Sequence, residues 1–224
     1  MEWGVIFDWD GVVVDSSAAH KRSWEQLAAD IGKPIPEDHM ERGFGKKNTT
    51  IIPDILGWAN EPEEVADLSD RKEALYRELL ASGHGRILPG ARELLGELRD
   101  WGIRCAVGSS TDRANIEQAI RQFGLEGCFD GIASAEDVVE GKPAPDVFLK
   151  SAASIGIAPA RCVVIEDAPY GIEAARRAGM KSVGLLTSHS SNTMDGADLV
   201  VPDLSFVSAA QLASIVNNQE TNRI

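Results

Sequence analysis

Two aspartates near the start of the chain, Asp8 and Asp10, follow the apolar run 5–7 and precede Gly11. Side chains alternate between the two faces of an extended chain, so both carboxylates are expected to point to the same side. Neighbouring carboxylates repel each other unless a cation compensates them, and their oxygens suit a divalent metal ion. Taken alone, the stretch also fits a strand that runs into a solvated acidic turn.

Three later segments carry groups that complement these acids. They are Ser109-Ser110-Thr111 after the apolar run 103–107, Lys142 in the loop before Pro143, and Glu166-Asp167 after the apolar run 162–165. Taken singly, they are interpreted as a helix cap, an ordinary loop and a second cap region. Together they would supply acids for Mg²⁺, hydroxyls for phosphoryl oxygens and an ammonium group for charge neutralisation. The combination indicates phosphoryl transfer.

Apolar runs of strand length and helical periodicity alternate along the second part of the chain. The runs lie at 103–107, 131–133, 162–165, 182–186 and 199–201. This alternation predicts an α/β fold with a parallel sheet covered by helices on both faces. The carboxyl ends of parallel strands lie at one edge of the sheet, so the four motifs should meet there.

The segment between the first strand and residue 88 is different, because its periodicity is almost entirely helical. Ser16-Ser17 is interpreted as a turn or helix cap, a short helix is expected near Pro53, and Pro62 opens a longer one. We therefore predict an α/β core domain from residues 1–15 and 88–224, with a helical cap domain over residues 16–87 inserted between them.

The composition limits the class of protein. The chain has 224 residues, 43% hydrophobic and 25% charged, as in an ordinary globular protein, and its net charge of −13 argues against nucleic-acid binding. No apolar run approaches the roughly 18 residues of a membrane span. Cys105, Cys128 and Cys162 are odd in number and are expected to be reduced. A cytoplasmic, monomeric protein without membrane contact is expected.

The ordered motifs resemble those of a known family. They are Phe7-Asp8-Trp9-Asp10-Gly11, Gly108-Ser109-Ser110, Gly141-Lys142-Pro143-Ala144-Pro145-Asp146 and Ile165-Glu166-Asp167-Ala168-Pro169-Tyr170-Gly171. The set resembles the haloacid dehalogenase-like superfamily, in the branch of β-phosphoglucomutase and related sugar-phosphate phosphatases. The resemblance implies a Rossmann-like α/β core with an inserted α-helical cap of the C1 type.

The resemblance also implies roles for individual residues. Asp8 would be the nucleophile that forms an aspartyl phosphate, and Asp10 would be the general acid and then the general base. Ser109 would hold a phosphoryl oxygen, and Lys142 would orient and neutralise Asp8 and the phosphate. The second acid argues against the dehalogenase branch, whose chemistry needs neither an acid/base at that position nor a metal.

The implied cofactor is Mg²⁺. It would be held by Asp8, Asp167 and the backbone carbonyl of Asp10, with Glu166 either supporting or ligating it. The implied partner is a small phosphorylated metabolite.

The residues expected to contact the substrate are His20, Lys46, Lys47, Asn48, Lys72, Ser110 and Thr111. Two of them have a second interpretation. His20 also fits a helix-face histidine that packs at the hinge. Lys72, on the apolar face of its helix, also fits a lysine that extends to the helix edge rather than one that meets an anion in a cleft.

Three functions fit these motifs. A phosphatase is favoured because water needs no second phosphate site. A mutase would need such a site on the cap, which Lys46, Lys47 and Lys72 could supply, but the loop Gly45-Lys46-Lys47-Asn48-Thr49 departs from the mutase pattern, which has Arg there. A non-catalytic relative that binds a phosphorylated ligand is the third alternative.

Overall fold

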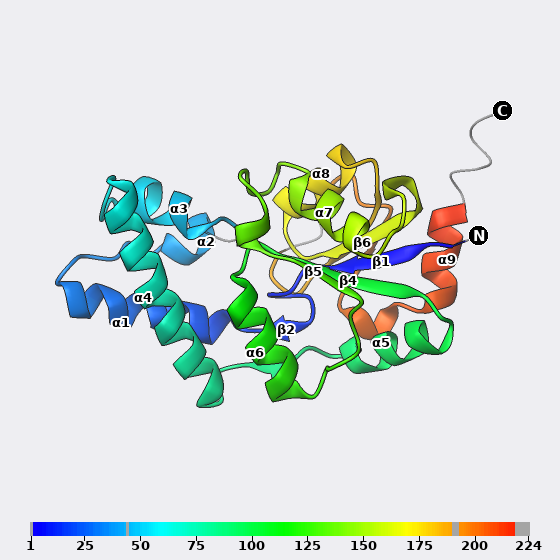
Figure 1. Ribbon diagram of the computed structural model, residues 1–224, viewed down its shortest axis with the longest axis horizontal. Coiled ribbons are helices and arrows are strands. Elements are labelled where there is room, and N and C mark those ends of the chain that lie inside the picture. The colour runs from blue at the N-terminus through cyan, green and yellow to red at the C-terminus, as the bar shows by residue number, and fades with distance from the viewer. Residues whose placement is uncertain (1, 44, 190–192, 218–224) are drawn as a thin grey trace.

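The core of the protein is a six-stranded, entirely parallel sheet with the strand order β5-β4-β1-β6-β7-β8. The computed structural model describes residues 2–43, 45–189 and 193–217. The strands are β1 (Gly4–Phe7), β4 (Arg104–Gly108), β5 (Gly131–Ala133), β6 (Cys162–Glu166), β7 (Lys181–Leu185) and β8 (Leu199–Val201). The predicted parallel sheet is confirmed, and β1 lies at its centre (Figure 1).

Helices cover both faces of this sheet, as the alternating pattern predicted. They are α5 (Ala91–Asp100), α6 (Arg113–Phe123), α7 (Asp146–Ser154), α8 (Pro169–Arg177) and α9 (Ala209–Asn217). Val5 and Phe7 of β1 belong to the hydrophobic cluster on one face, and Ile6 belongs to the cluster on the other. Because β1 is buried on both faces, its sequence is a continuous apolar run, and its end is held rigidly at the edge of the sheet.

The inserted segment consists of helices, as predicted. They are α1 (Ser17–Ile31), α2 (His39–Gly43), α3 (Asn48–Thr50), the π-helix η1 (Ile51–Leu56) and α4 (Pro62–Ala81). These helices share a hydrophobic cluster of their own, which includes Trp24, Ile52 and Leu68, and they lie at one end of the molecule (Figure 1). The helix expected near Pro53 begins earlier, at Asn48, and Pro53 lies within the π-helical part. The domain boundaries at residues 15 and 88 stay a prediction.

A short antiparallel ribbon joins the two parts of the chain. Val14–Asp15 (β2) pairs with Arg86–Ile87 (β3), and the Arg86 guanidinium lies 2.9 Å from the Asp15 carboxylate. The chain therefore leaves the core and returns to it at adjacent points. Strands of two residues carry no periodicity, which is why the sequence did not indicate them.

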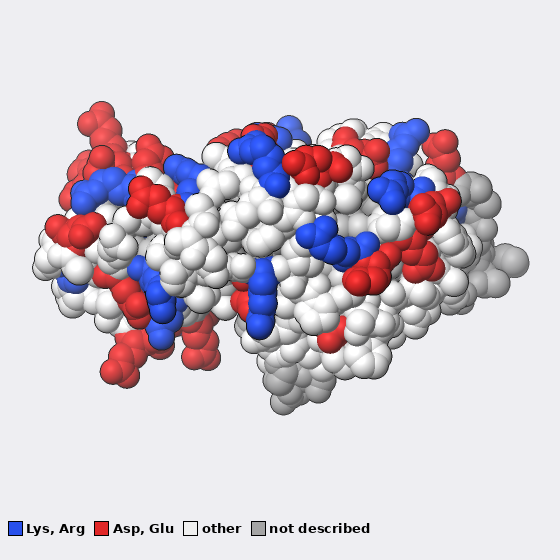
Figure 2. Space-filling model, turned by 90° about the horizontal axis from the view of Figure 1, so that it is seen from below, with Lys and Arg blue, Asp and Glu red and all other residues white. Residues whose placement is uncertain are grey.

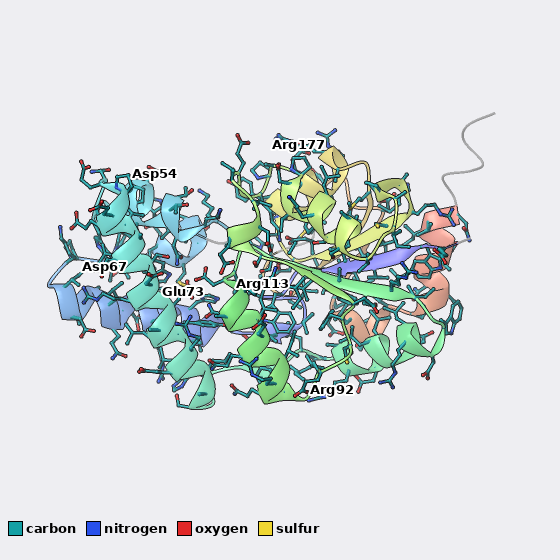
Figure 3. All side chains as sticks on the ribbon, viewed as in Figure 1. Asp54, Asp67, Glu73, Arg92, Arg113 and Arg177 are labelled. Carbon is teal, nitrogen blue, oxygen red and sulfur yellow. The ribbon has the colours of Figure 1, made fainter. Side chains whose placement is uncertain are left out.

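Helix α4 of the cap also packs against α6 of the core. Gln118 Nε2 donates to the Arg77 carbonyl at 2.8 Å, and Gln122 Nε2 donates to the Leu80 carbonyl at 2.8 Å. Figure 3 shows Glu73 on α4 closer to the core than Asp54 and Asp67, which lie farther out on the cap. We call this contact between α4 and α6 the cap–core seam.

On the face drawn in Figure 2, Lys and Arg side chains are interspersed with Asp and Glu. Among the described residues, no helix is long and apolar enough to cross a membrane. Cys105, Cys128 and Cys162 carry free thiols, and Cys105 and Cys162 are buried.

Candidate active site

The motifs predicted to meet do so at the carboxyl edge of the sheet. Asp8 follows β1, Ser109 follows β4, Glu166 ends β6, and Lys142 lies in the loop before α7. A cavity of about 990 Å³ opens at this edge, lined by Asp8, Asp10, Ser109, Ser110, Thr111 and Lys142 from the core and by His20, Lys46, Asn48, Lys72 and Glu73 from the cap. The site thus lies between the sheet edge and the cap.

Lys142 bridges two of the buried acids. Its Nζ lies 2.9 Å from Asp8 Oδ1 and 2.6 Å from Glu166 Oε1. Burial disfavours the ammonium ion, but Asp8 and Glu166 outweigh this effect and raise the pKa of Lys142. Burial and the charge of Glu166 favour the protonated form of Asp8, whereas Lys142 favours its carboxylate. The first two effects are larger together and raise the pKa of Asp8 to about 7. One ammonium group therefore does not fully compensate the acids around it.

Glu166 is held in a fixed orientation by several donors. Its Oε1 accepts from Lys142, and its Oε2 accepts from the backbone N–H groups of Asp167 and Ala168, both at 2.7 Å. A Cβ atom at Gly171 would lie 1.8 Å from Glu166 Oε1, so only glycine leaves room for this carboxylate. Of the two roles predicted for Glu166, these contacts favour the support of Lys142 and of the loop.

Asp8, Glu166 and Asp167 form a buried group whose carboxylate oxygens lie within 4.8 Å of one another. Within the described part of the chain, the Ser188 hydroxyl is the neutral donor that acts on the Asp167 carboxylate, whose oxygens are otherwise without hydrogen-bond partners. Burial and the charges of Glu166 and Asp8 raise the pKa of Asp167 well above its ordinary value. Gly11 has φ +82°, and a Cβ there would lie 1.8 Å from Asp167 Oδ2. This cradle of uncompensated oxygens fits a hard cation such as Mg²⁺.

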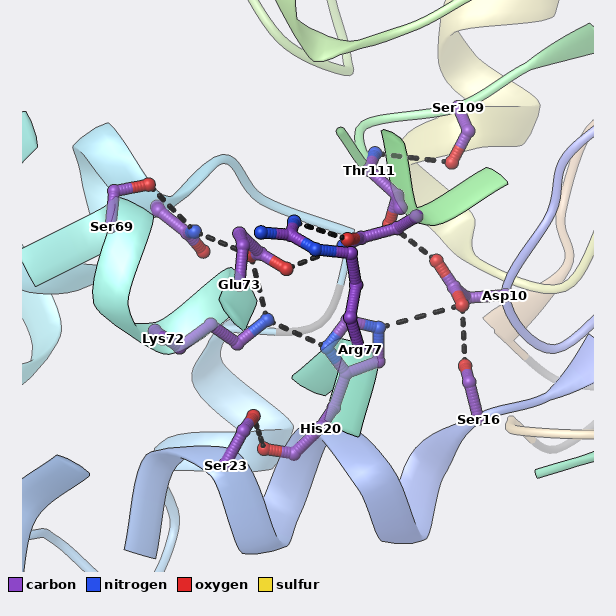
Figure 4. Close-up of polar contacts among 12 residues, drawn as sticks. Asp10, Ser16, His20, Ser23, Ser69, Lys72, Glu73, Arg77, Ser109 and Thr111 are labelled. Atoms are coloured by element: carbon purple, nitrogen blue, oxygen red, sulfur yellow. Dashed lines mark hydrogen bonds and ion pairs between the residues drawn. The ribbon is translucent and has the colours of Figure 1, made fainter. Parts of the chain in front are cut away.

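The Asp10 side chain faces His20 of the cap (Figure 4). Its carboxylate accepts hydrogen bonds from Ser16 and, at 2.5 Å, from Thr111, and it lies 3.4 Å from His20 Nε2. Burial raises the pKa of Asp10, but His20 and the two hydroxyl donors outweigh burial and lower it to about 2. The free site therefore holds Asp10 as a carboxylate, ready to accept a proton.

His20 is connected to Lys72 on the next cap helix. Lys72 Nζ lies 2.9 Å from His20 Nδ1 and 2.8 Å from Glu73 Oε1. An ammonium group only donates, so Nδ1 accepts and the His20 proton lies on Nε2, facing Asp10. Tyr76 stacks on the His20 ring, with centroids 4.3 Å apart. These contacts place His20 against Asp10 rather than in simple hinge packing.

The interpretation of Lys72 as a residue that extends to the helix edge is wrong, because the residue is only 1% exposed. Its charge is instead compensated by the adjacent carboxylate of Glu73. Lys72 also lies over the rings of Trp24 and Tyr76, at 5.3 and 5.2 Å from their centroids. Cation–π contacts of this kind help a desolvated ammonium group to remain buried.

The remaining predicted contacts divide into two groups. Lys46 and Ser110 line the cavity, and Ser109 Oγ accepts from the Thr111 N–H at 3.1 Å, which leaves its own hydrogen for a ligand. Lys47 does not line the cavity and instead donates to the Val138 carbonyl at 2.8 Å.

Asn48 lines the cavity, but its amide donates to Ser69 Oγ at 2.9 Å and to Glu73 Oε1 at 2.6 Å. Sequence reasoning missed Glu73 and Asn115, and it interpreted Ser16 as a turn or cap. Glu73 follows Lys72 directly, and this pairing of an acid with a lysine on an apolar face was the available signal.

The comparisons with known proteins agree with this arrangement. The chain matches the family described as haloacid dehalogenase-like hydrolase over residues 4–179. It belongs to this family. The chain is 34% identical over 203 residues to β-phosphoglucomutase from Bacillus subtilis, covering 88% of each protein. It is 32% identical over 220 residues to the chloroplastic 5-amino-6-(5-phospho-D-ribitylamino)uracil phosphatase of Arabidopsis thaliana, covering 97% of this chain and 59% of that protein.

Among solved structures, the fold is similar to that of β-phosphoglucomutase from Clostridium difficile. The TM-score is 0.86 at 28% sequence identity, over 99% of this chain and all of that one (100%). The predicted family and the predicted α/β fold are thus confirmed. The protein is an enzyme of the haloacid dehalogenase-like hydrolase family, whose relatives include a β-phosphoglucomutase and a phosphatase.

Proposed function

We propose that this chain is a Mg²⁺-dependent phosphatase that hydrolyses a small phosphate monoester, such as a sugar phosphate, through an aspartyl phosphate on Asp8. The observation that carries the proposal is the buried acid Asp8 at the end of β1, in contact with Lys142 and grouped with Asp167. A carboxylate nucleophile divides phosphoryl transfer into two easier steps.

In the first step, a carboxylate oxygen of Asp8 attacks phosphorus, and the bond from phosphorus to the ester oxygen breaks. Lys142, 2.9 Å from Asp8, orients the nucleophile, and the Ser109 hydroxyl donates to a phosphoryl oxygen. Asp10 first takes up a proton from solvent as the substrate binds, and the departing alkoxide then takes this proton from Asp10. Approach of the negatively charged phosphoryl group disfavours a second negative charge, which raises the pKa of Asp10 from its resting value of about 2.

In the second step, Asp10 takes a proton from a water molecule, whose oxygen attacks phosphorus. The bond between phosphorus and the Asp8 oxygen breaks, which releases inorganic phosphate and restores the Asp8 carboxylate. His20 and the Thr111 hydroxyl keep the Asp10 carboxylate oriented towards the reacting oxygen. Asp8 and Asp167 would hold the Mg²⁺ ion, with the Asp10 carbonyl as a further ligand. When bound, the ion would neutralise charge that develops on the phosphoryl oxygens.

The cap favours the phosphatase over the mutase, because two of the three lysines that could hold a second phosphate are engaged elsewhere. Lys72 is paired with Glu73, and Lys47 donates to the Val138 carbonyl. Lys46 lies 5.8 Å from the centroid of the Tyr170 ring. A mutase must bind a second phosphate on the cap side, whereas transfer to water requires no such site.

The test is an assay of β-glucose 1-phosphate with and without glucose 1,6-bisphosphate, in which free phosphate and glucose 6-phosphate are measured together. A phosphatase releases phosphate and forms no more glucose 6-phosphate than hydrolysis of the added bisphosphate can supply. Glucose 6-phosphate formed in large excess over a catalytic amount of the bisphosphate would instead identify a mutase. A panel of other sugar monophosphates extends the assay to the substrate.

Turnover of p-nitrophenyl phosphate with and without Mg²⁺ tests whether the chain is a catalyst at all. Absence of turnover, together with absence of a beryllium fluoride complex at Asp8, would favour a non-catalytic relative that binds a phosphorylated ligand.

A further inference from the structure

A line of buried and partly buried polar contacts leaves the core at Asp10, passes through the cap and returns to the core at Asn115. We call it the relay, and its members are Asp10, His20, Lys72, Glu73 and Asn115. Figure 4 shows how Lys72 and Glu73 of α4 lie between His20 and the segment that follows β4. The part of the relay from Asp10 to Lys72 belongs to the proposed acid/base machinery. The part from Glu73 to Asn115 has no role in the steps described above.

Asn115 lies in the first turns of α6, on the core side of the cap–core seam, and is fully buried. Its Nδ2 donates to Glu73 Oε2 at 2.5 Å, and its Oδ1 accepts from Arg77 Nη1 at 3.0 Å. Both partners belong to α4 of the cap. The two halves of the amide are thus used as their chemistry requires, with the donor facing a carboxylate and the acceptor facing a guanidinium.

Glu73 depends on this amide. Its Oε1 accepts from Lys72 and Asn48, and Asn115 donates to its Oε2. A buried carboxylate oxygen that loses its donor is strongly destabilised, so the Glu73 carboxylate would turn towards the donors that remain to it. These are Asn48 and Lys72, and Lys72 also holds His20 Nδ1. Loss of the Asn115 amide would therefore draw Lys72 away from His20 and release the orientation of His20 against Asp10.

We propose that Asn115 is a positioning residue for Asp10, acting through Glu73, Lys72 and His20. The inference rests on the proposed function, because it assigns Asp10 the acid/base role. Both ends of the relay contact the core segment that follows β4, because this segment carries Asn115 and also Thr111, which donates to Asp10. The relay is therefore complete only when α4 is packed against α6. Docking of the cap and alignment of the acid/base group are the same event.

The test uses two phosphate esters that differ in their need for an acid. The alkoxide of a sugar phosphate needs a proton as it leaves, whereas p-nitrophenolate leaves without one. The value of kcat/KM covers every step up to departure of the leaving group. Asn115→Leu should lower kcat/KM by about 10- to 100-fold for the sugar phosphate and by less than about threefold for p-nitrophenyl phosphate.

Gln118→Leu is the matched control at the same seam. Gln118 also donates from α6 to α4, but to the Arg77 carbonyl, which lies outside the relay. This variant should change kcat/KM for the two esters by the same factor. An Asn115→Leu variant that behaves in the same way, with equal losses for both esters, would overturn the proposal and leave a structural role for the amide.

Asn115→Asp provides a second readout in a side chain of the same shape. At high pH a carboxylate would face Glu73 and repel it, whereas a protonated carboxyl could again donate to Glu73 Oε2. The ratio of variant to wild-type kcat/KM on the sugar phosphate should rise about tenfold from pH 8 to pH 5.5, and the ratio for Asn115→Leu should not. A ratio for Asn115→Asp that is flat with pH would overturn the proposal.

The same measurements separate this inference from the proposed function. If the wild-type protein turns over neither ester in the presence of Mg²⁺, the proposed function fails. If it turns over both and the variants lose both equally, only the role of Asn115 fails. Thermal denaturation of each variant shows whether it is folded at the assay temperature. If Asn115→Leu is not folded, Asn115→Asp provides the test.

Discussion

Mg²⁺ is expected to bind more weakly as the pH falls below about 7, because the ion must displace protons from the acids that would hold it. Burial and Glu166 raise the pKa of Asp8 to about 7, and burial with its acidic neighbours raises the pKa of Asp167 well above the ordinary value. A metal ion binds the ionised carboxylates, so its binding releases these protons. The perturbation is therefore a change of pH across the range in which Asp8 titrates.

The magnitude follows from the ionised fraction of Asp8. Between pH 7.5 and pH 5.5, a group with a pKa of about 7 loses about 25-fold in its ionised fraction, so the dissociation constant should rise about 25-fold. Proton release from Asp167 as well would increase the effect. A carboxyl group with the ordinary pKa of 3.8 would change the dissociation constant by less than about twofold over the same range.

In the absence of metal, the free energy of unfolding should depend on pH through the same shift in the pKa of Asp8. The pKa of Asp8 is raised on folding from 3.8 to about 7, so the ionised form is disfavoured in the folded state. Its contribution to stability is complete below about pH 4 and is lost as the pH rises through about 7. This difference corresponds to at most about 4 kcal/mol of unfolding free energy. Mg²⁺ should restore that stability at pH 7.5 and do so much less at pH 5.5.

Isothermal titration calorimetry of Mg²⁺ at pH 5.5, 6.5 and 7.5 measures the affinity, and thermal denaturation with and without Mg²⁺ measures the stability. Asp167→Asn is the control, since it removes a predicted ligand and should weaken binding at every pH. An affinity for Mg²⁺ that is equal at pH 5.5 and pH 7.5 would refute the reasoning.

Other substitutions test separate parts of the site. Asp10→Asn should lower kcat on a sugar phosphate by roughly 10²- to 10⁴-fold while the protein stays folded, and a loss below tenfold in steady-state assays would argue against the acid/base role. Gly171→Ala should lower the unfolding free energy by about 1–3 kcal/mol, measured by urea denaturation, because its Cβ would displace the Glu166 carboxylate; an unchanged midpoint would contradict this. Glu73→Gln removes the carboxylate that neutralises Lys72, so a sugar bisphosphate should inhibit about tenfold more strongly, and equal or weaker inhibition would argue against that neutralisation.

The central part of the site could be predicted from the sequence because topology places it. Asp8, Ser109 and Glu166 each stand at the end of an apolar run, and parallel strands bring their carboxyl ends to one edge. The predicted parallel sheet and the helical insertion are likewise present. These features depend on periodicity and chain order, which a single sequence records directly.

Contacts between side chains on different helices could not be predicted in this way. Helical spacing placed Lys72 on a buried face, but it did not show that Glu73, the next residue, would compensate its charge. Ser16 was interpreted as a turn or cap, yet its hydroxyl donates to Asp10. Lys47 was expected at the substrate and instead donates to the Val138 carbonyl. Each partner depends on how the inserted helices are oriented against the core, which the residue pattern does not specify.

The most direct test is to find where the phosphoryl group resides during turnover. The enzyme would be mixed with a sugar monophosphate and Mg²⁺, quenched in acid within the first turnovers, and digested for peptide mass spectrometry. The account predicts a phosphoryl group on Asp8 of the wild-type enzyme. The Asp8→Asn variant should form no such adduct and release no phosphate. A phosphoryl group on a different residue, or undiminished phosphate release by Asp8→Asn, would contradict it.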